Sequence, residues 1–291
     1  MKNQVTDIFK DKGQTYSFEL FPPKTEKGYQ KLLGTLGDLC RLQPDFISCT
    51  YGAGGGNREK TLEIAQHIQE QLSTPSIAHL TCVCHTKDEI RGILQDMKTR
   101  GIGNILALRG DPPLDNPDWQ PGKNNFRYAK DLCAFVREEF GHDFTIGVAG
   151  FPEGHPLCPE LDQDARFLKE KVDNGADFVI TQLFFDNAHY FDYVKRLRAL
   201  GVNSRVIPGI LPITHYDNLL RFCQSCGTTI PSQVHEIFKP IREDKDKMLE
   251  EGIRFCIQQC RELLEGGAPG LHFYALNKLH PVDTILKNVR I

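Results

Sequence analysis

The sequence of 291 residues lacks the features that mark several large classes of protein. Its net charge is only -3, with no run of basic residues, which argues against a nucleic-acid-binding protein. No apolar stretch approaches the roughly 18 residues of a membrane-spanning helix, so we predict no membrane association. The N-terminal stretch MKNQVTDIFKDKGQ also has no apolar signal core, and we therefore expect a cytoplasmic location.

The ten cysteines are scattered along the chain, and several lie in apolar runs. A reduced cysteine in such a run behaves as a small hydrophobic residue, as is usual in cytoplasmic proteins. Cys223 and Cys226 form a C-x-x-C pair, and Cys256 and Cys260 lie one helical turn apart. A metal-dependent interaction protein organised by these four thiols is therefore an alternative, although we predict no metal site.

Short apolar runs rich in strand-forming residues recur along the chain and predict buried strands. The eight runs are Tyr16–Phe21, Asp45–Tyr51, Ser76–Val83, Asn104–Gly110, Thr145–Phe151, Phe178–Phe185, Arg205–Leu211 and Leu271–Asn277. Because they alternate with segments of helical period, they predict a parallel sheet covered by helices, in the α/β class. Eight such units in a chain of this length match a (β/α)8 TIM barrel. A doubly wound open sheet is the alternative, but no G-x-G-x-x-G motif opens a helix after any run.

The segments between these runs carry helix signals. One segment has the apolar face Leu62, Ala65, Ile68 and Leu72. Thr86 and Glu89 match a capping box before the next helix, and glycines stand where helix C-caps are expected. The long gap before the last run predicts an extra helix around Lys245–Glu265. No linker or low-complexity tract divides the chain, so we predict a single domain over residues 1–291.

The segment SFELFPP, residues 17–23, places one carboxylate in an otherwise apolar strand. Glu19 lies between Phe18 and Leu20, and the strand should end at the following prolines because proline donates no ladder hydrogen bond. Burial among apolar groups raises the pKa of a carboxyl group toward neutrality, which would suit Glu19 to general acid catalysis. The alternative is a glutamate at a strand end that points to water or pairs with a lysine.

Polar side chains stand near the carboxyl end of nearly every predicted strand, where barrels of this type carry their chemistry. They include Glu19, Thr50, Tyr51, His79, Arg109, Asp111, Glu153, His155, Gln182, Asp186, His272, Tyr274, Asn277 and Lys278. Ordinary structural interpretations are also open: His79 can be a core histidine, and Arg109 can pair with Asp111. The glycine-rich residues 52–56 can form a turn, or can bind an anion through successive backbone N–H groups. Gln182 lies in an apolar strand, and because a buried amide must be hydrogen-bonded, it is a candidate ligand-binding residue.

Taken together, eight motifs in series resemble those of the methylenetetrahydrofolate reductase family. They are SFELFPPK, FISCTYGAGGG, AHLTCV, ILALRGDPP, GFPEGHP, LKEKVDNGADFVITQLFFD, IPGILPI and GLHFYALNK. They extend from about Ser17 to about Lys278 and coincide with the predicted strands. The resemblance is to the catalytic barrel alone, without the regulatory domain of eukaryotic members, and so to the short bacterial form.

The resemblance implies a flavoenzyme with FAD across the open end of the barrel. NADH or NADPH would reduce the flavin and leave, and 5,10-methylenetetrahydrofolate would then take the same place and become 5-methyltetrahydrofolate. Such a ping-pong order uses one flavin face for both substrates. The family has no nicotinamide fingerprint of the Rossmann type, so the sequence does not distinguish the two nicotinamides. Bacterial relatives form homo-oligomers, which implies a homo-oligomer here.

The resemblance also implies roles for single residues. Glu19 matches the general acid that promotes opening of the five-membered folate ring. Asp111 matches an aspartate that binds the pterin, and its charge should lower the reduction potential of a nearby flavin. Gln182 matches an amide that serves both substrates, and Phe222 matches an aromatic residue that stacks on each. Lys278 stands where some bacterial members have an arginine that contacts the folate.

Two groups of residues match flavin-binding positions of the family. The group beside the flavin ring is Thr50, Tyr51, Ala53, His79, Arg109, Gly110 and Asp111. The group toward the ribityl, phosphate and adenine end is Tyr128, Ala129, Ala149, His155, Asp164 and Lys171, with Lys171 as the natural pyrophosphate partner. A different barrel enzyme with Lys278 as a Schiff-base amine is the other enzymatic hypothesis, and it needs a lysine of lowered pKa near a strand end.

Overall fold

The computed structural model describes residues 4–23, 25–51, 58–113 and 116–290. Within them, parallel strands form one sheet in the order β7-β6-β5-β4-β3-β2-β1-β9-β8. The strands are β1 (Thr15–Leu20), β2 (Phe46–Cys49), β3 (Ser76–Thr81), β4 (Asn104–Leu108), β5 (Thr145–Gly150), β6 (Phe178–Thr181), β7 (Arg205–Ile207), β8 (Gly209–Ile210) and β9 (Gly270–Tyr274). Each predicted run therefore contains a strand, or in one case two.

The seventh predicted strand is divided at Pro208, and its two halves close the sheet into a barrel. β7 pairs with β6, whereas β8 pairs with β9. Proline has no N–H to donate, but the carbonyl oxygen of Pro208 accepts a 3.0 Å hydrogen bond from the backbone of His272. At the next position, a Cβ on Gly209 would lie 2.2 Å from the carbonyl oxygen of Thr181, so the close approach needs glycine. The predicted (β/α)8 barrel is confirmed, and the open-sheet alternative is wrong.

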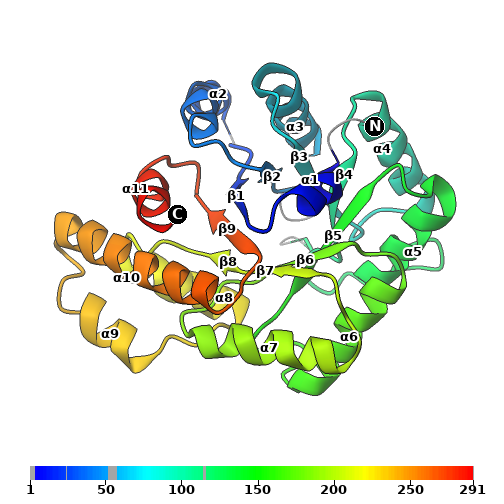
Figure 1. Ribbon diagram of the computed structural model, residues 1–291. Helices are drawn as coiled ribbons and strands as arrows, with labels where there is room; N and C mark the ends of the chain where they lie inside the picture. The colour runs from blue at the N-terminus through cyan, green and yellow to red at the C-terminus, as the bar shows by residue number, and fades with distance from the viewer. Residues whose placement is uncertain (1–3, 24, 52–57, 114–115, 291) are drawn as a thin grey trace.

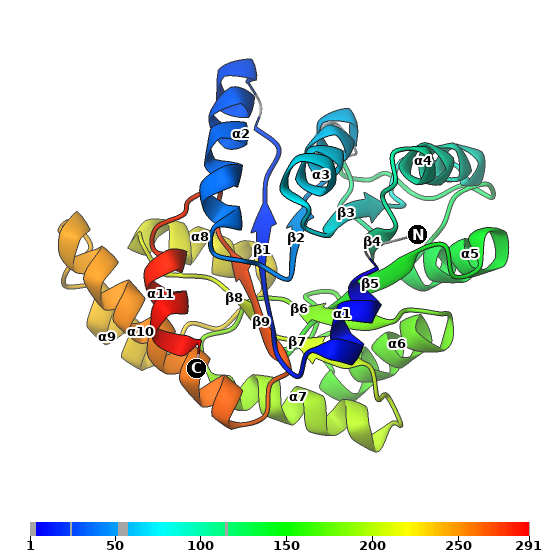
Figure 2. The same cartoon turned by 45° about the horizontal axis from the view of Figure 1, so that its top comes forward.

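Helices surround the strands (Figure 1), and Figure 2 shows the first and last long strands, β1 and β9, side by side. The helices are α1 (Val5–Asp11), α2 (Glu26–Cys40), α3 (Arg58–Leu72), α4 (Lys87–Thr99), α5 (Ala129–Phe140), α6 (Leu161–Asp173), α7 (Asn187–Ala199), α8 (Tyr216–Cys226), α9 (Ser232–Phe238), α10 (Lys245–Glu265) and α11 (Val282–Val289). The predicted extra helix is α10, and α8 and α9 precede it in the same gap. No helix in the described ranges has the length and apolar character needed to cross a membrane.

The local helix signals are confirmed. At the start of α4, the backbone N–H of Glu89 donates to the Thr86 hydroxyl at 3.2 Å, and the Glu89 carboxylate accepts from the Thr86 N–H at 2.7 Å. This is the reciprocal capping box that the spacing predicted. Gly201 has a φ of +80° one residue beyond the C-cap of α7, a left-handed conformation that glycine adopts without a Cβ penalty.

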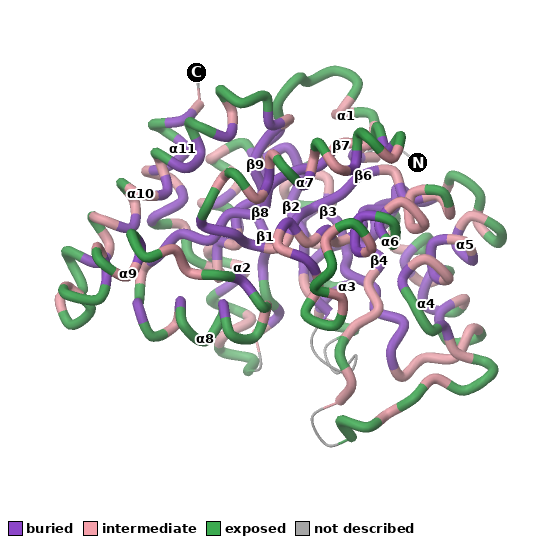
Figure 3. The backbone as a smooth tube through the Cα atoms, turned by 90° about the horizontal axis from the view of Figure 1, so that it is seen from below, coloured by how far each residue is buried: buried purple, intermediate pink, exposed green. Residues whose placement is uncertain are grey.

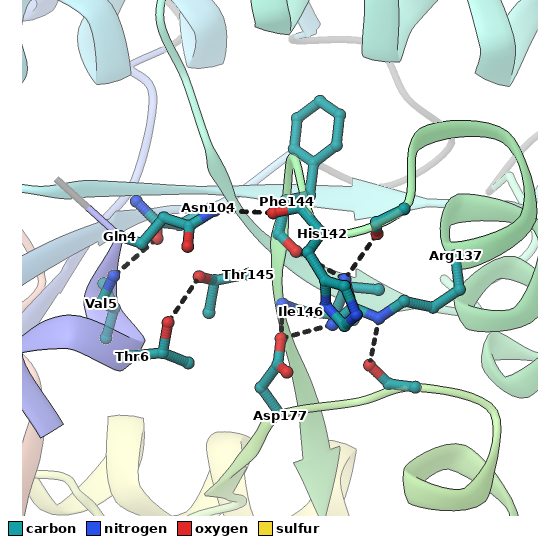
Figure 4. A network of polar contacts seen from close by, with 12 residues as sticks. Gln4, Val5, Thr6, Asn104, Arg137, His142, Phe144, Thr145, Ile146 and Asp177 are labelled. Atoms are coloured by element: carbon teal, nitrogen blue, oxygen red, sulfur yellow. Dashed lines mark hydrogen bonds and ion pairs between the residues drawn. The ribbon is translucent and has the colours of Figure 1, made fainter. Parts of the chain in front are cut away.

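α1 closes the amino-terminal end of the barrel, which the sequence did not predict. Val5 and Phe9 pack against Phe46 and Phe178, the first residues of β2 and β6. The Phe9 and Phe178 rings meet edge-to-face with centroids 5.3 Å apart. Figure 4 shows the polar side of this contact, where the backbone N–H of Val5 donates to Asn104 Oδ1 at 2.8 Å. Apolar side chains thus fill this end of the barrel, which we call the floor.

A second network in Figure 4 joins α5 to the beginnings of β5 and β6. Arg137 donates to the carbonyl oxygen of Phe144 at 2.7 Å and to Asp177 Oδ2 at 2.6 Å. The same Asp177 oxygen accepts a 2.7 Å hydrogen bond from the backbone N–H of Ile146. Because arginine presents its donors in a rigid fork, this arrangement fixes two loops at the lower end of the barrel.

The strand side chains alternate between the barrel interior and the layer beneath the helices, as the pleat requires. Phe18 and Leu20 of β1 belong to the main apolar cluster, together with Leu36 of α2. Ser17 and Glu19 therefore point the other way, into the barrel. Figure 3 shows that burial is concentrated in the strands, while the outer faces of the helices are exposed. The residues that can form a site lie inside the barrel and around the carboxyl ends of its strands, which we call the rim.

Candidate active site

The carboxylate of Glu19 lies inside the barrel between two histidines. Its Oε2 atom is 3.3 Å from Nε2 of His79 on β3 and 3.7 Å from Nε2 of His272 on β9. The Glu19 side chain is only 9% exposed, and His272 is fully buried. The interpretation of Glu19 as a residue that points to water or pairs with a lysine is therefore wrong.

The expected rise in the pKa of Glu19 is also wrong. Burial is the largest single influence and acts to raise the pKa, but the imidazoles of His79 and His272 together outweigh it and lower the pKa to about 2. The physical reason is the alternation of the strand. The apolar neighbours Phe18 and Leu20 face the helices, whereas Glu19 faces a polar interior.

Two serines continue this polar interior below Glu19. Ser17 Oγ lies 2.8 Å from Nδ1 of His272 and donates to the carbonyl oxygen of Leu271 at 3.4 Å. The shorter contact ties the His272 ring to Ser17, and either atom can be its donor, depending on the tautomer of the imidazole. Nε2 of His272 then faces Glu19, with the Ser48 hydroxyl 3.4 Å away. The lowered pKa values of Glu19 and His272 both disfavour a proton on this pair at neutral pH.

His79 is not a fully satisfied core histidine. Its Nε2 atom is buried and has no hydrogen-bond partner of acceptable geometry in the described part of the chain. The 3.3 Å contact with Glu19 is close enough for an ion pair but is not directed as a hydrogen bond. The ring nitrogen of His79 is therefore available to a ligand in the barrel.

The residues after β4 turn sharply at the rim. Gly110 has a φ of +82°, and a Cβ there would lie 2.6 Å from a methyl group of Val83. Arg109 donates from Nε to the carbonyl oxygen of Gly110 at 3.2 Å, while Asp111 is exposed. Among the described residues no ion pair joins Arg109 to Asp111, so the simple pairing of these two side chains is not observed. The turn leaves both charges at the rim.

The two described residues that follow β2, Thr50 and Tyr51, differ in their burial. Thr50 is half-buried, and its carbonyl oxygen accepts a 2.8 Å hydrogen bond from the Thr61 hydroxyl. Tyr51 is 1% exposed, packs in the main apolar cluster, and has its hydroxyl 3.4 Å from Nε2 of His85. Any contact of Tyr51 with a ligand in the barrel would therefore come from its backbone. Ala53 and the glycine-rich residues 52–56 lie outside the described residues.

The Gln182 carboxamide is oriented by its own backbone. Its Oε1 atom accepts a 2.9 Å hydrogen bond from the N–H of Leu183, and its backbone N–H donates to Gly150 at 2.7 Å. The acceptor side of the amide is thus engaged, and among the described residues the NH₂ group has no hydrogen-bond partner. Gln182 also lines a small cavity with Glu153, Cys226 and other residues of the neighbouring loops. A half-buried amide with a free donor group suits ligand binding.

The predicted phosphate-binding residues gather between β5 and α6. Lys171 donates to the carbonyl oxygen of Ala149 at 2.9 Å, and burial lowers its pKa. Asp164, two helical turns earlier on α6, has its pKa raised to about 6 by burial. His155 has its pKa lowered, first by burial and then by the charges of Arg109 and Lys171. The Phe151 ring lies beside both Lys171 and His155, with Lys171 Nζ 5.7 Å from its centroid and the His155 ring edge-to-face at 4.7 Å.

Four other predicted residues lie toward the outside of this region. Tyr128 is 47% exposed and is the N-cap of α5, and Ala129 is the first residue of that helix. Phe222 is 36% exposed on α8, and Lys278 is exposed in the turn after β9. The side chains of Tyr128, Phe222 and Lys278 are exposed, whereas Ala129 is buried, and no contact of the four with Glu19 is found in the described residues.

Comparison with known sequences connects this geometry to a family. The family described as "Methylenetetrahydrofolate reductase" matches residues 4–290. The chain belongs to the methylenetetrahydrofolate reductase family. Glu19, Asp111 and Gln182 therefore lie in a barrel of the family that their motifs resembled.

Two relatives illustrate the extent of the match. The chain is 38% identical over 276 residues to "Methylenetetrahydrofolate reductase 1" of Schizosaccharomyces pombe, covering 94% of this chain and 46% of the relative. It is 36% identical over 262 residues to "5,10-methylenetetrahydrofolate reductase" of Salmonella typhimurium, covering 90% of this chain and 86% of the relative. The chain thus spans about half the length of the fission yeast and plant relatives, and most of the bacterial one.

A solved structure shows the same fold at low sequence identity. A Clostridium thermocellum protein covers 99% of this chain and 98% of its own, with a TM-score of 0.68 and 14% identity. Its description states that it binds two copies of 5-methyl-5,6,7,8-tetrahydrofolic acid. For the present member of the methylenetetrahydrofolate reductase family, this likeness shows the barrel fold alone.

The four cysteines of the metal-site hypothesis do not form a ligand set in this family member. Cys256 and Cys260 are buried in the main apolar cluster with their sulfur atoms 4.0 Å apart, whereas Cys223 packs in a second cluster. Within the described ranges, no group of three or more histidine, cysteine or acidic residues could hold a metal ion. The thiols behave as core residues.

Sequence reasoning identified Glu19 but missed the residues that control it. His272 was noted only as a polar residue of the last strand, and Ser17 and Ser48 were given no role. Period-two alternation was the available signal, because residues two positions apart on one strand share a face. Applied to β1, it would have placed Ser17 and Glu19 together in the interior.

Proposed function

We propose that the protein reduces 5,10-methylenetetrahydrofolate to 5-methyltetrahydrofolate, with NADH or NADPH as electron donor and FAD as bound cofactor. The observation that carries the proposal is the buried carboxylate of Glu19, held between His79 and His272 inside the barrel. The family and the name of the Salmonella relative support this substrate. The Clostridium protein, whose description names a methylated tetrahydrofolate, supports a folate site in a barrel of this fold.

The residues present fit FAD. Lys171 is a partly buried cation over the Phe151 ring, and no ion pair to an acidic side chain is found for it in the described residues. A pyrophosphate would add a bound anion to this cation, which lies within the influence of the Asp164 charge. The buried ring nitrogen Nε2 of His79 has no hydrogen-bond partner in the described part of the chain, and Arg109 is a half-buried cation at the end of β4. Bound FAD would supply hydride chemistry, which amino-acid side chains lack.

Glu19 and His272 would together supply the proton for the folate. The pKa of Glu19 is lowered by its histidines, and burial lowers the pKa of His272. Both shifts disfavour a bound proton at neutral pH in the protein without ligand, so the proposal requires that Glu19 is protonated in the folate complex. Glu19 can then pass this proton to a folate nitrogen, which promotes opening of the five-membered ring. His272 keeps its orientation through the Nδ1 hydrogen bond to Ser17.

The other residues would bind and orient. The free NH₂ group of Gln182 would donate to each substrate in turn, consistent with a ping-pong order in which both use one place. Asp111 would hydrogen-bond the pterin, and its negative charge would lower the reduction potential of the flavin. Phe222 would stack on the substrates, and Lys278 would attract the negative charge of the folate. We also propose that the protein is cytoplasmic, forms a homo-oligomer and consists of a single domain.

The decisive experiment separates the two half-reactions in a stopped-flow instrument. We expect purified protein reconstituted with FAD to be yellow, and to be reduced by one of the two nicotinamides. Glu19→Gln should slow folate reduction at least about 100-fold, the usual contribution of a general acid, and leave reduction by nicotinamide nearly unchanged. Glu250→Gln, at an exposed position of α10, is the matched control. Equal loss of both half-reactions would refute the acid role, and failure to bind FAD would refute the flavoenzyme.

A further inference from the structure

One side chain joins the first and last strands beyond the end of their ladder. Asn277 accepts a 2.9 Å hydrogen bond at Oδ1 from the backbone N–H of Phe21. Its Nδ2 group donates to the carbonyl oxygen of the same residue at 2.8 Å. Both backbone groups of Phe21 are thus bound by one carboxamide from the opposite end of the chain.

This contact replaces a rung of the sheet. The β1–β9 register ends at the pair Glu19 and Tyr274, and Pro22 follows Phe21 without an N–H. A carboxamide has the same donor and acceptor as a peptide group, so the Asn277 side chain mimics a neighbouring strand. The rim segment after Glu19 is therefore held against β9 although the strand pairing has ended.

The backbone at Asn277 is shaped for this role. Leu276 and Asn277 have φ angles of +50° and +59°, two successive left-handed residues that are not glycine. Such a conformation costs free energy, and asparagine tolerates it better than most residues. The turn is closed by a 2.9 Å hydrogen bond from the N–H of Lys278 to the carbonyl oxygen of Ala275. The strained turn thus directs Asn277 at Phe21 and places Lys278 next to it.

We propose that Asn277 is a positioning residue that fixes the rim strand of Glu19 relative to the loop of Lys278. The clamp binds residue 21, two positions after the acid, and lies one position before the lysine. The inference rests on the proposed function, in which Glu19 and Lys278 act on the same folate. Reduction by a nicotinamide needs no proton from Glu19, so loss of the clamp should affect the two half-reactions differently.

The test uses Asn277→Gly in the FAD-loaded protein, because glycine keeps the left-handed backbone and removes only the carboxamide. Ser73→Gly is the matched control: Ser73 is exposed, has a φ of +50°, and lies after α3. We expect the Phe21 amide to exchange its hydrogen at least about tenfold faster in Asn277→Gly than in the control, since its acceptor is gone. This readout does not depend on the activity of the loaded enzyme.

In the kinetic measurement, folate reduction should be at least about tenfold slower in Asn277→Gly, because small misplacements of reacting groups are costly. The rate at which the nicotinamide reduces the flavin should stay within about twofold of the control. Should Asn277→Gly fail to fold, Asn277→Asp, which keeps the acceptor but loses the donor, should show a smaller folate-selective loss. Unchanged folate kinetics, or equal losses in both half-reactions, overturn the positioning role while the wild type still reduces folate. A wild type that reduces no folate overturns the proposed function, and the role of Asn277 with it.

Discussion

The environment of Glu19 makes a quantitative prediction about acid stability, tested by Glu19→Gln. The carboxyl pKa falls from an ordinary 4.5 to about 2 in the folded protein. A group whose pKa is lowered by folding stabilises the fold above its unfolded pKa, and this stability is lost as the pH falls toward the folded pKa. The fall corresponds to about 3 kcal/mol of unfolding free energy, and the side chain is buried enough that solvent screening is small.

Comparison with Glu19→Gln separates Glu19 from its neighbour His272. His272 also has a lowered pKa, chiefly through burial, so it destabilises the fold in the same direction as the pH falls below about 6.5. His272 is present in both the wild type and Glu19→Gln, so its contribution largely cancels when the two proteins are compared, and the difference reports the carboxylate. Between pH 5 and pH 3 the wild type should therefore lose about 2 kcal/mol more than Glu19→Gln.

Urea unfolding followed by circular dichroism at pH 5, 4 and 3 measures this difference. Glu250→Gln should follow the wild type, because its side chain is exposed on α10. A raised pKa, as the local sequence suggested, would reverse the sign and make the wild type relatively more stable in acid. Equal losses in wild type and Glu19→Gln, or that reversed sign, would refute the assignment of Glu19 to the two histidines.

Three further predictions address the fold and the cofactor. Gly252→Ala should lower the free energy of unfolding by about 3 kcal/mol, because the methyl group would lie 1.7 Å from the carbonyl oxygen of Ile213. Gly92→Ala, whose methyl group would have nothing within 4 Å, should raise it by about 0.5 kcal/mol, and similar Tm values for the two variants would contradict this. Phe9→Ala should lower the free energy of unfolding in urea by about 3 kcal/mol, since the Phe9 ring packs in the barrel floor, and a decrease below about 1 kcal/mol would argue against this packing. Lys171→Met should weaken FAD binding about tenfold in a fluorescence titration, with a smaller effect for Lys171→Arg, and an unchanged Kd would remove Lys171 from the site.

Local patterns predicted most of the fold. The eight apolar runs each contain strand, and α10 has the predicted bounds of Lys245–Glu265. The break at Pro208 was readable in principle, since proline cannot donate to a ladder. The floor helix α1 was missed because it is short, and its stability comes from packing against Phe46 and Phe178 rather than from its own sequence.

The candidate site was predicted less completely, and for a specific reason. Motifs named Glu19, His79 and Gln182, but the pKa of Glu19 was assigned the wrong direction from its neighbours along the chain. The groups that control it, His272 and Ser17, approach through the barrel interior from strand pairing. Asn277 was likewise visible as a polar residue, while its bond to Phe21 spans 256 positions.

By itself, the order of residues determined the succession of strands and helices, the family, and the identity of the polar groups at the strand ends. These depend on periodicity, capping and turn chemistry, which act over a few neighbouring residues. Tertiary structure alone decided which imidazoles face the Glu19 carboxylate, how the divided strand closes the ring, and where Asn277 binds. Those features depend on contacts between distant segments, and the charge state of a buried acid follows from what lies across the barrel rather than from what lies beside it in the chain.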